Sequence, residues 1–270
     1  MTISAEISDL IEFTEAQAFA DMLAAAPREW GAWSERREGG WILQVPTIDI
    51  LLFNRVIGAG LPAATREEID DCVAPFKSTK LKNWGVQLSP AAEPEELPDW
   101  LEGHGLIRRD SWSKVYRPVG DVPEVRTDLR IEPAGRKDAA AVGRITRTAF
   151  GMPEAREPWI ASLVGRPNWH HYLAVDDGEP VAAAALYVHG PVGWLGVAGT
   201  LEGARRRGAQ GALMARRLVD GARLGCQWFV TETSQDLPGL PNPSYHNMIR
   251  LGFQLAYHRP NYLPASLTPV

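Results

Sequence analysis

The chain has 270 residues, of which 45% are hydrophobic, and its 33 acidic and 28 basic side chains give a formal net charge of -5. This composition excludes a disordered chain and leaves room for two domains of ordinary size. The acidic balance disfavours nucleic-acid binding, which needs Lys and Arg gathered on one face. The amino terminus lacks a basic, apolar leader, and the longest uncharged apolar stretch, 181–188, is too short to cross a bilayer. We therefore expect a cytoplasmic protein that does not associate with a membrane.

The first half of the chain shows its elements in a weak pattern. Strands are predicted over 41–45, 50–56, 84–88 and 113–117, and helices over 65–76 and 97–103. Thr65, followed three residues later by Glu68, predicts a capping box at the first of these helices. This half also holds six of the ten tryptophans; we expect core packing for most of them, and some could line a substrate pocket.

A segment with two prolines and a glycine, residues 118–124, reads as a linker. It predicts two domains, 1–125 and 126–270. Both halves end with a strand, a Pro-rich loop, a short helix, a Gly followed by an apolar residue, and a strand that reaches Arg-Pro. This shared order indicates a diverged internal duplication.

The second half has a clearer pattern. Strands are predicted over 130–132, 172–175, 181–188, 192–198, 227–233 and 253–258, and helices over 136–150, from 153, over 212–224 and over 243–251. This order predicts an α/β fold: a mixed sheet with helices on both faces. Cys72 and Cys226 each sit in an apolar pattern without partners at metal-ligand spacing, so we expect reduced buried thiols and no metal site.

The most informative stretch follows the strand that ends near Thr200. It reads Arg205, Arg206, Arg207, Gly208, Ala209, Gln210, Gly211. A strand, a Gly-containing turn and a helix start gather free backbone N–H groups, and the helix dipole adds partial positive charge there. The arginines can pair with further phosphate oxygens. We therefore expect this bend to bind an anion such as a pyrophosphate.

With this loop the second half resembles the GCN5-related N-acetyltransferase superfamily. The family signature, Gln/Arg-x-x-Gly-x-Gly/Ala, is met at Arg205 and Gly208, whereas Gln210 replaces the final small residue. The family's Gly-Phe after its fourth helix is met at 252–253, and the resemblance covers about 129–262. The first half matches only in outline and has no such loop, so the resemblance is to a tandem arrangement with a degenerate first half. We expect that half to shape the acceptor cleft or an interface.

The resemblance implies that acetyl-CoA is the co-substrate and that its pantetheine arm lies where two strands separate and their amides stay unpaired. Three groups of residues are then the expected cofactor contacts: Ala198, Gly199 and Thr200 on the strand edge, the seven residues from Arg205 to Gly211, and Asn242, Ser244 and Asn247 around the short helix. For Asn242 and Ser244, helix capping is an equally open role.

Acetyl transfer to an amine needs a base, a donor to the thioester oxygen and help for the leaving thiolate. The resemblance implies a tyrosine acid four residues before Gly252, but Met248 stands there, so Tyr245 is the nearest substitute. Glu232, at the end of the strand that borders the gap, is the candidate base, because half-burial of a carboxylate raises its pKa. No Cys–His pairing is evident, which favours direct attack without an acyl-enzyme.

The leading hypothesis is an acetyl-CoA-dependent N-acetyltransferase that acts on a primary amine of a small molecule or peptide. Met248 keeps a second hypothesis open, a non-catalytic acyl-CoA-binding sensor or interaction module. A third, a phosphate binder that uses the three arginines on a nucleotide or nucleic acid, is disfavoured by the net charge. The sequence leaves the acceptor and the acyl group open, and it is compatible with a homodimer.

Overall fold

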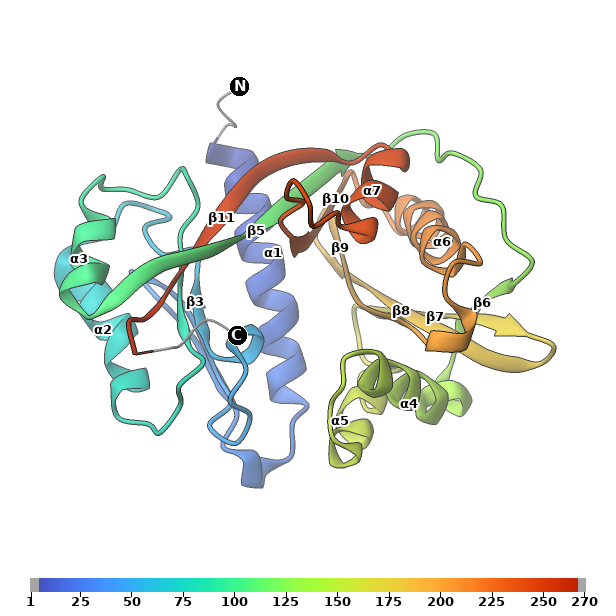
Figure 1. Ribbon diagram of the computed structural model, residues 1–270, viewed down its shortest axis with the longest axis horizontal. Helices are drawn as coiled ribbons and strands as arrows, with labels where there is room; N and C mark the ends of the chain where they lie inside the picture. Colours follow the sequence, from blue (N-terminus) through green and yellow to red (C-terminus); the bar gives the residue numbers. More distant parts are fainter. Residues whose placement is uncertain (1–4, 267–270) are drawn as a thin grey trace. The chain divides into compact units, whose positions relative to one another are not determined.

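The computed structural model describes residues 5–266 (Figure 1). The chain divides into two compact units: unit 1 runs to Lys114 and resumes at Leu255, and unit 2 spans Val115–Gln254. The predicted boundary at 125/126 differs from this division, because the carboxy-terminal strand pairs with a strand of the first half. Within the described residues, no helix has the length and apolar character that a membrane span requires.

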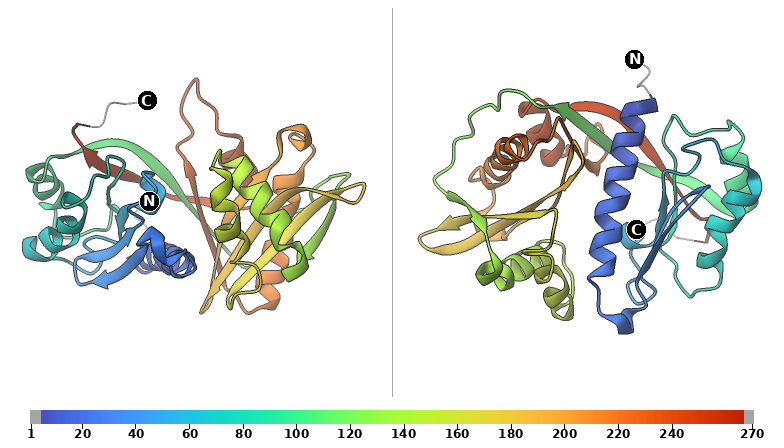
Figure 2. Two further views of the ribbon diagram at one scale, coloured as in Figure 1. Left: turned by 90° about the horizontal axis from the view of Figure 1, so that it is seen from below. Right: turned by 180° about the vertical axis from the view of Figure 1, so that it is seen from behind.

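Unit 1 is built on strands ordered β1-β2-β3-β4-β11-β5. The strands are β1 Trp33–Arg37, β2 Gly40–Gln44, β3 Arg55–Ile57, β4 Gly85–Gln87, β5 Leu106–Pro118 and β11 Gln254–Pro264. The helices are α1 Ala5–Ala24, α2 Arg66–Lys77 and α3 Leu97–Gly103. The long helix α1 packs along β1, β2 and β3 (Figure 2), while β11 pairs antiparallel with β4.

One prediction for unit 1 is confirmed, one holds in part and one is wrong. The capping box is present: Thr65 N–H donates to Glu68 at 2.7 Å, and Glu68 N–H donates to the Thr65 hydroxyl at 3.3 Å. Of the six tryptophans in this half, Trp84 is buried and stacks on Phe76 with centroids 4.9 Å apart, whereas the other five are partly buried. The predicted strand over 50–56 begins instead as a 3-10 turn, because the Asn54 side chain bonds the local backbone.

Five charged side chains lie in the interior of unit 1: Glu12, Glu15, Arg55, Lys114 and Arg259. The Glu15 carboxylate pairs with Arg55 and Arg259, each at 2.9 Å, and with Lys114. Arg259 also reaches Glu12 at 2.7 Å. Burial alone would raise the pKa of Glu15, but the cations outweigh burial and bring it well below its usual range. The cluster therefore ties α1 to β3, β5 and β11.

Unit 2 is a mixed sheet ordered β10-β9-β8-β7-β6, and the end of β5 runs beside β10. Its strands are β6 Arg130–Ala134, β7 Trp169–Asp176, β8 Glu179–His189, β9 Val192–Thr200 and β10 Trp228–Ser234. Its helices are α4 Ala139–Ala149, α5 Glu157–Ala161, α6 Ala209–Arg223 and α7 Pro243–Arg250. Strands β6 to β9 are antiparallel neighbours and β10 is parallel to β9. Figure 1 shows α4 and α5 on one face and α6 on the other, which confirms the predicted layers.

Strand β9 leaves its parallel partner at mid-length. Its pairing with β10 covers only 192–194, opposite 228–230. On its other side the register with β8 shifts between Ala183 and Ala185, and Val197 adopts φ 49°, a region that β-branched residues rarely enter. The bulge turns the strand, so residues 195–200 have no register partner on β10. The predicted gap between these two strands is present.

The buried charges of unit 1 give a stability prediction. Replacing Glu15 with Gln removes the counter-ion that three buried cations share, so we expect a loss of about 3–5 kcal/mol in the free energy of unfolding. Urea denaturation followed by circular dichroism measures it. Glu6→Gln, at an exposed position of the same helix, is the control and should change stability by less than about 0.5 kcal/mol. Equal stability of the two variants would contradict the assigned role.

Candidate active site

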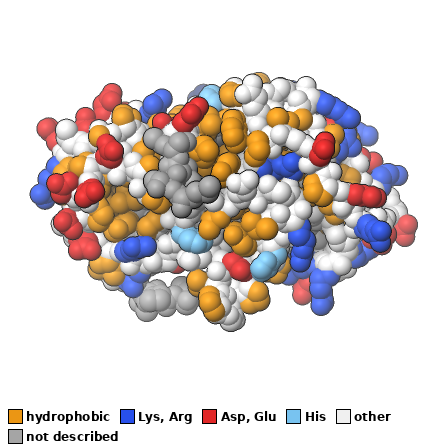
Figure 3. Space-filling view, turned by 90° about the horizontal axis from the view of Figure 1, so that it is seen from above, with side chains coloured by type: hydrophobic (Ala, Val, Ile, Leu, Met, Phe, Trp, Pro, Cys, Tyr) orange, Lys and Arg blue, Asp and Glu red, His pale blue; other side chains and the backbone are white. Residues whose placement is uncertain are grey.

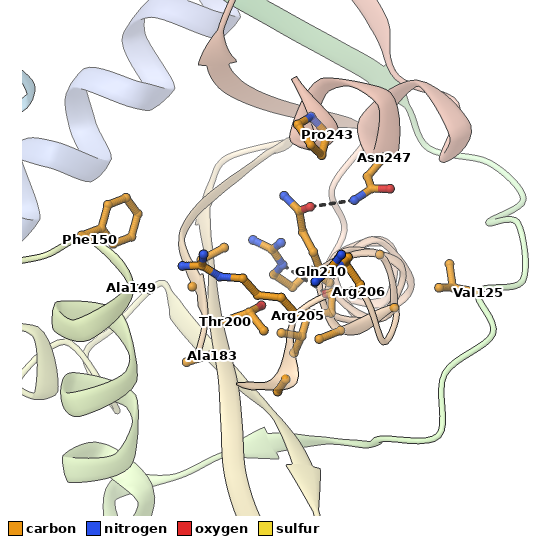
Figure 4. Close-up of a pocket in the computed structure, with 18 residues that line it drawn as sticks. Val125, Ala149, Phe150, Ala183, Thr200, Arg205, Arg206, Gln210, Pro243 and Asn247 are labelled. Atoms are coloured by element: carbon orange, nitrogen blue, oxygen red, sulfur yellow. Dashed lines mark hydrogen bonds between the residues drawn. The ribbon is translucent and has the colours of Figure 1, made fainter. Parts of the chain in front are cut away.

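A pocket of about 640 Å³ lies in unit 2 beside the separated part of β9 (Figure 4). Ten of the thirteen predicted cofactor residues line it: Ala198, Gly199, Thr200, Arg205, Arg206, Gly208, Ala209, Gln210, Gly211 and Asn247. The end of α4 contributes Ala149 and Phe150 from the opposite face of the sheet. The pocket therefore joins the arginine-rich loop to the gap and reaches both faces of the sheet.

The loop owes its shape to two left-handed residues. Arg206 has φ 63° and Gly208 has φ 82°, after which α6 begins at Ala209. A Cβ at Gly208 would lie 2.5 Å from the Arg126 carbonyl oxygen, so both backbone angle and space require glycine there. Among the described residues, nothing accepts from the N–H groups of 206–208, and the first N–H groups of α6 have no partner inside the helix. Several amide donors thus stand together at one end of the pocket.

Arg207 does not share the role predicted for it. Its guanidinium bonds to both oxygens of Asp176, at 2.5 and 2.9 Å, and to Asp128 at 2.5 Å, and it does not line the pocket. Donating hydrogen bonds to the two carboxylates raises the pKa of Arg207 above its usual range. The predicted role of the Arg207 side chain is therefore corrected: it anchors the loop to β7 and to Asp128, whereas the contact predicted for its backbone N–H stays a prediction.

Gln210, which stands where the family signature has a small residue, bridges two helices. Its Nε2 donates to the Ser244 hydroxyl at 2.7 Å, and its Oε1 accepts from Asn247 Nδ2 at 2.7 Å (Figure 4). Asn247 in turn accepts from Arg250 at 2.9 Å. The Ser244 hydroxyl is used in this bridge and does not line the pocket, which corrects its predicted role as a direct contact. Gln210 thus fixes α7 against α6 at the rim.

Asn242 is a helix cap. Its Oδ1 accepts from the N–H groups of Ser244 and Tyr245, at 2.9 and 3.2 Å, and its Nδ2 donates to Thr233 and Ser234. These bonds occupy both ends of the amide, and Asn242 does not line the pocket. Of the two roles left open by the sequence, capping is the one present, so its assignment as a cofactor contact is corrected.

Packing within unit 2 requires a small residue at Gly199. A Cβ there would lie 2.5 Å from the Ala149 Cβ, so the glycine lets α4 pack against β9. The close approach is therefore to a helix of the same unit. The backbone of Gly199 still lines the pocket, as do its neighbours in β9.

The two predicted catalytic residues lie near the pocket elements but do not line the pocket. Glu232 is partly buried. Phe229 packs in the core under α6, so strand alternation places Glu232 on the opposite face, the face that α4 covers elsewhere in this sheet. Tyr245 packs partly buried against the same core as Phe229. Met248 is 4% exposed within that core, which accounts for an apolar residue at the position of the family tyrosine. Both catalytic assignments stay predictions.

Arg217 is the one charged residue of the pocket that was not among the predicted site residues. An arginine on a surface helix is expected to face solvent, but the Arg217 side chain is 1% exposed and lines the pocket. The signal was its spacing: it follows Gln210 by seven residues, two helical turns, and so shares the inward face. An arginine on an inward face departs from the apolar–polar pattern of a helix, so periodicity alone does not indicate it.

Charge is unevenly distributed between the units. Unit 1 carries 19 acidic and 12 basic residues, whereas unit 2 carries 14 acidic and 16 basic. Figure 3 shows the same asymmetry on one face, with Asp and Glu gathered over unit 1 and Lys and Arg over unit 2. The unit that holds the amide-rich loop is thus the one whose overall charge favours a polyanion.

Solved structures of other proteins share the fold of this chain. No family profile matches the sequence, and no curated protein matches it. Among solved structures, a GCN5-related N-acetyltransferase from Kribbella flavida aligns over 99% of this chain and 97% of its own, with TM-score 0.64 and 18% identity. A tandem GNAT protein from the clavulanic acid biosynthesis pathway aligns over 80% of this chain and 75% of its own, with TM-score 0.55 and 16% identity. The chain therefore has the fold of a tandem GCN5-related N-acetyltransferase, with the pocket in its second unit.

Proposed function

We propose that the protein is an acyl-CoA-dependent N-acyltransferase that transfers the acyl group, expected to be acetyl, to a primary amine. The observation that carries the proposal is the meeting, in one pocket, of the amide-rich loop and the gap beside β9. A diphosphate fits the first, because unpaired N–H groups and the start of α6 favour negative charge there. A thioester arm fits the second, because unpaired strand amides can bond to it.

The contacts to the coenzyme follow from the pocket walls. Arg205 and Arg206 line the pocket at the loop and are the cations that pair with phosphate oxygens. Ala198 and Thr200 flank Gly199 on the separated part of β9, where small side chains leave room for the arm. Asn247, held by Gln210, adds a side-chain amide on the α7 side.

Direct attack by the amine agrees with the state of the thiols. Burial raises the pKa of both Cys72 and Cys226 to about 11, so neither is a thiolate near neutral pH. An acyl-enzyme on cysteine is therefore disfavoured. We assign proton removal from the amine to Glu232 and protonation of the leaving thiolate to Tyr245.

The alternative function is an acyl-CoA-binding module without turnover. Two observations favour it: Met248 is buried where the family has its acid, and neither Glu232 nor Tyr245 lines the pocket. It shares the binding step with the enzyme and differs in the chemical step. The two functions are therefore separated by turnover, not by affinity for CoA.

The loop arginines give the first test of the proposal. Replacing Arg205 and Arg206 together with Ala removes two charge-assisted contacts, so we expect CoA to bind about 10- to 100-fold more weakly by calorimetry. Arg223→Ala is the control, because this arginine lies at the far end of α6 with 74% of its side chain exposed, and its variant should bind CoA like the parent. Parent protein that binds no CoA would refute the proposal.

Glu232 gives the second test. If it is the base, Glu232→Gln should lower kcat with an amine panel by about 10²- to 10⁴-fold while the Kd for CoA stays unchanged. Glu179→Gln, at the exposed start of β8, is the control. Unchanged turnover in the Glu232 variant would remove that residue from the mechanism. CoA binding by the parent protein without turnover on any amine would favour the non-catalytic module.

A further inference from the structure

A buried cation forms part of the inner wall of the pocket, and its partners are all neutral. Arg217 Nη1 donates to the Ala185 carbonyl at 2.8 Å and lies 3.5 Å from that of Gly196, while Nε donates to the Leu213 carbonyl at 3.1 Å. No carboxylate of the described residues forms an ion pair with it. Burial lowers its pKa to about 9, which still leaves it protonated at neutral pH.

The place of Arg217 in the fold puts it at the inner end of the gap. It follows the first residue of α6 by eight positions, about 12 Å along the helix from the amide-rich loop. Its carbonyl partners Ala185 and Gly196 face each other in the β8–β9 register beside the bulge at Val197. Pairing of β9 with β10 ends two residues earlier, at Trp194. A coenzyme held by its diphosphate at the loop and laid along 200–198 brings its acyl end toward this arginine.

These hydrogen bonds use Nε and Nη1 of the Arg217 guanidinium and leave Nη2. Among the described residues no atom accepts from Nη2, although the side chain lines the pocket. The neighbouring walls, Ala183, Ala198 and Leu213, supply no negative charge. A buried ion without a counter-ion is costly, and a carboxylate on the bound molecule both neutralises it and accepts from Nη2.

Arg217 lies on the side of the pocket where the acyl donor, the CoA thioester, is proposed to bind. It projects from the helix that begins at the amide-rich loop, whereas Ala149 and Phe150 enter from α4 on the other face of the sheet. Building on the proposed function, we propose that Arg217 selects a CoA thioester whose acyl group ends in a carboxylate, of the length of malonyl or succinyl. The amine nitrogen attacks the thioester carbon, the C–N bond forms, the C–S bond breaks, and the thiolate leaves with the electron pair. The proton of the amine passes to the base, and the distal carboxylate stays on Arg217 unchanged.

Calorimetry with free CoA, butyryl-CoA and succinyl-CoA tests the proposal, because the two thioesters have the same chain length and differ in the terminal carboxylate. The parent protein should bind succinyl-CoA at least about 10-fold more tightly than butyryl-CoA, which corresponds to about 1.4 kcal/mol. Arg217→Met should abolish that preference, so that the variant binds the two thioesters with equal Kd. Arg216→Met is the matched control. Arg216 is the neighbour of Arg217 in the chain, bonds to Asp220 and does not line the pocket, so the Arg216→Met variant should keep the preference.

The outcomes are distinguishable. Equal affinity of the parent protein for the two thioesters overturns the proposal and leaves the proposed function standing, and so does a preference that survives in Arg217→Met. This parent comparison decides the question even if Arg217→Met fails to fold, which circular dichroism reports. A preference that appears only among acceptor amines, for those that carry a carboxylate, overturns the assignment to the donor. No binding of any CoA compound overturns both proposals.

Discussion

The separation of β9 from β10 is the constraint on which the site depends. A continuous parallel pair would use the amides of both strands and leave no space between them. The pairing ends before the bulge at Val197, whose unusual backbone angle lies beside the shifted β8 register and next to Gly196, the carbonyl of which is 3.5 Å from Arg217 Nη1. A strained β-branched residue persists only where its surroundings fix it, and such residues concentrate at functional sites. The loop, the gap and the buried Arg217 are therefore parts of one site.

The two halves use the start of a helix in opposite ways. In unit 1 the side chains of Thr65 and Glu68 cap α2, so its first amides are already bonded within the protein. In unit 2 the residue before α6 is Gly208, which has no side chain to offer, and the amides there face the pocket. The same secondary structure is thus closed in one unit and open to a ligand in the other, which agrees with placing the anion in unit 2 alone.

The sequence predicted features that depend on neighbours along the chain: the order of elements in unit 2, the capping box, and the glycine turn before α6. It did not predict features that depend on distant residues. The Arg207 side chain bonds to two carboxylates far from it in sequence and so does not line the pocket. Arg217 can be buried because carbonyl oxygens of β8 and of α6 accept hydrogen bonds from it. Helix α1 was missed because its apolar residues define no single face and the ion cluster buries two of its glutamates. Periodicity cannot reveal partners that only tertiary structure supplies.

The pairing of β11 with β4 has a consequence for how the protein is made. About 170 residues separate the two strands along the chain, so on the ribosome β4 emerges long before its neighbour. Until then Glu12 and Glu15 also lack Arg259. The amino-terminal half is consequently the first to be synthesised and the last to be completed. A cut at the linker would release an amino-terminal fragment in which β4 has an open edge and Glu12 has lost its ion pair with Arg259, so the first half cannot complete this sheet without the end of the chain.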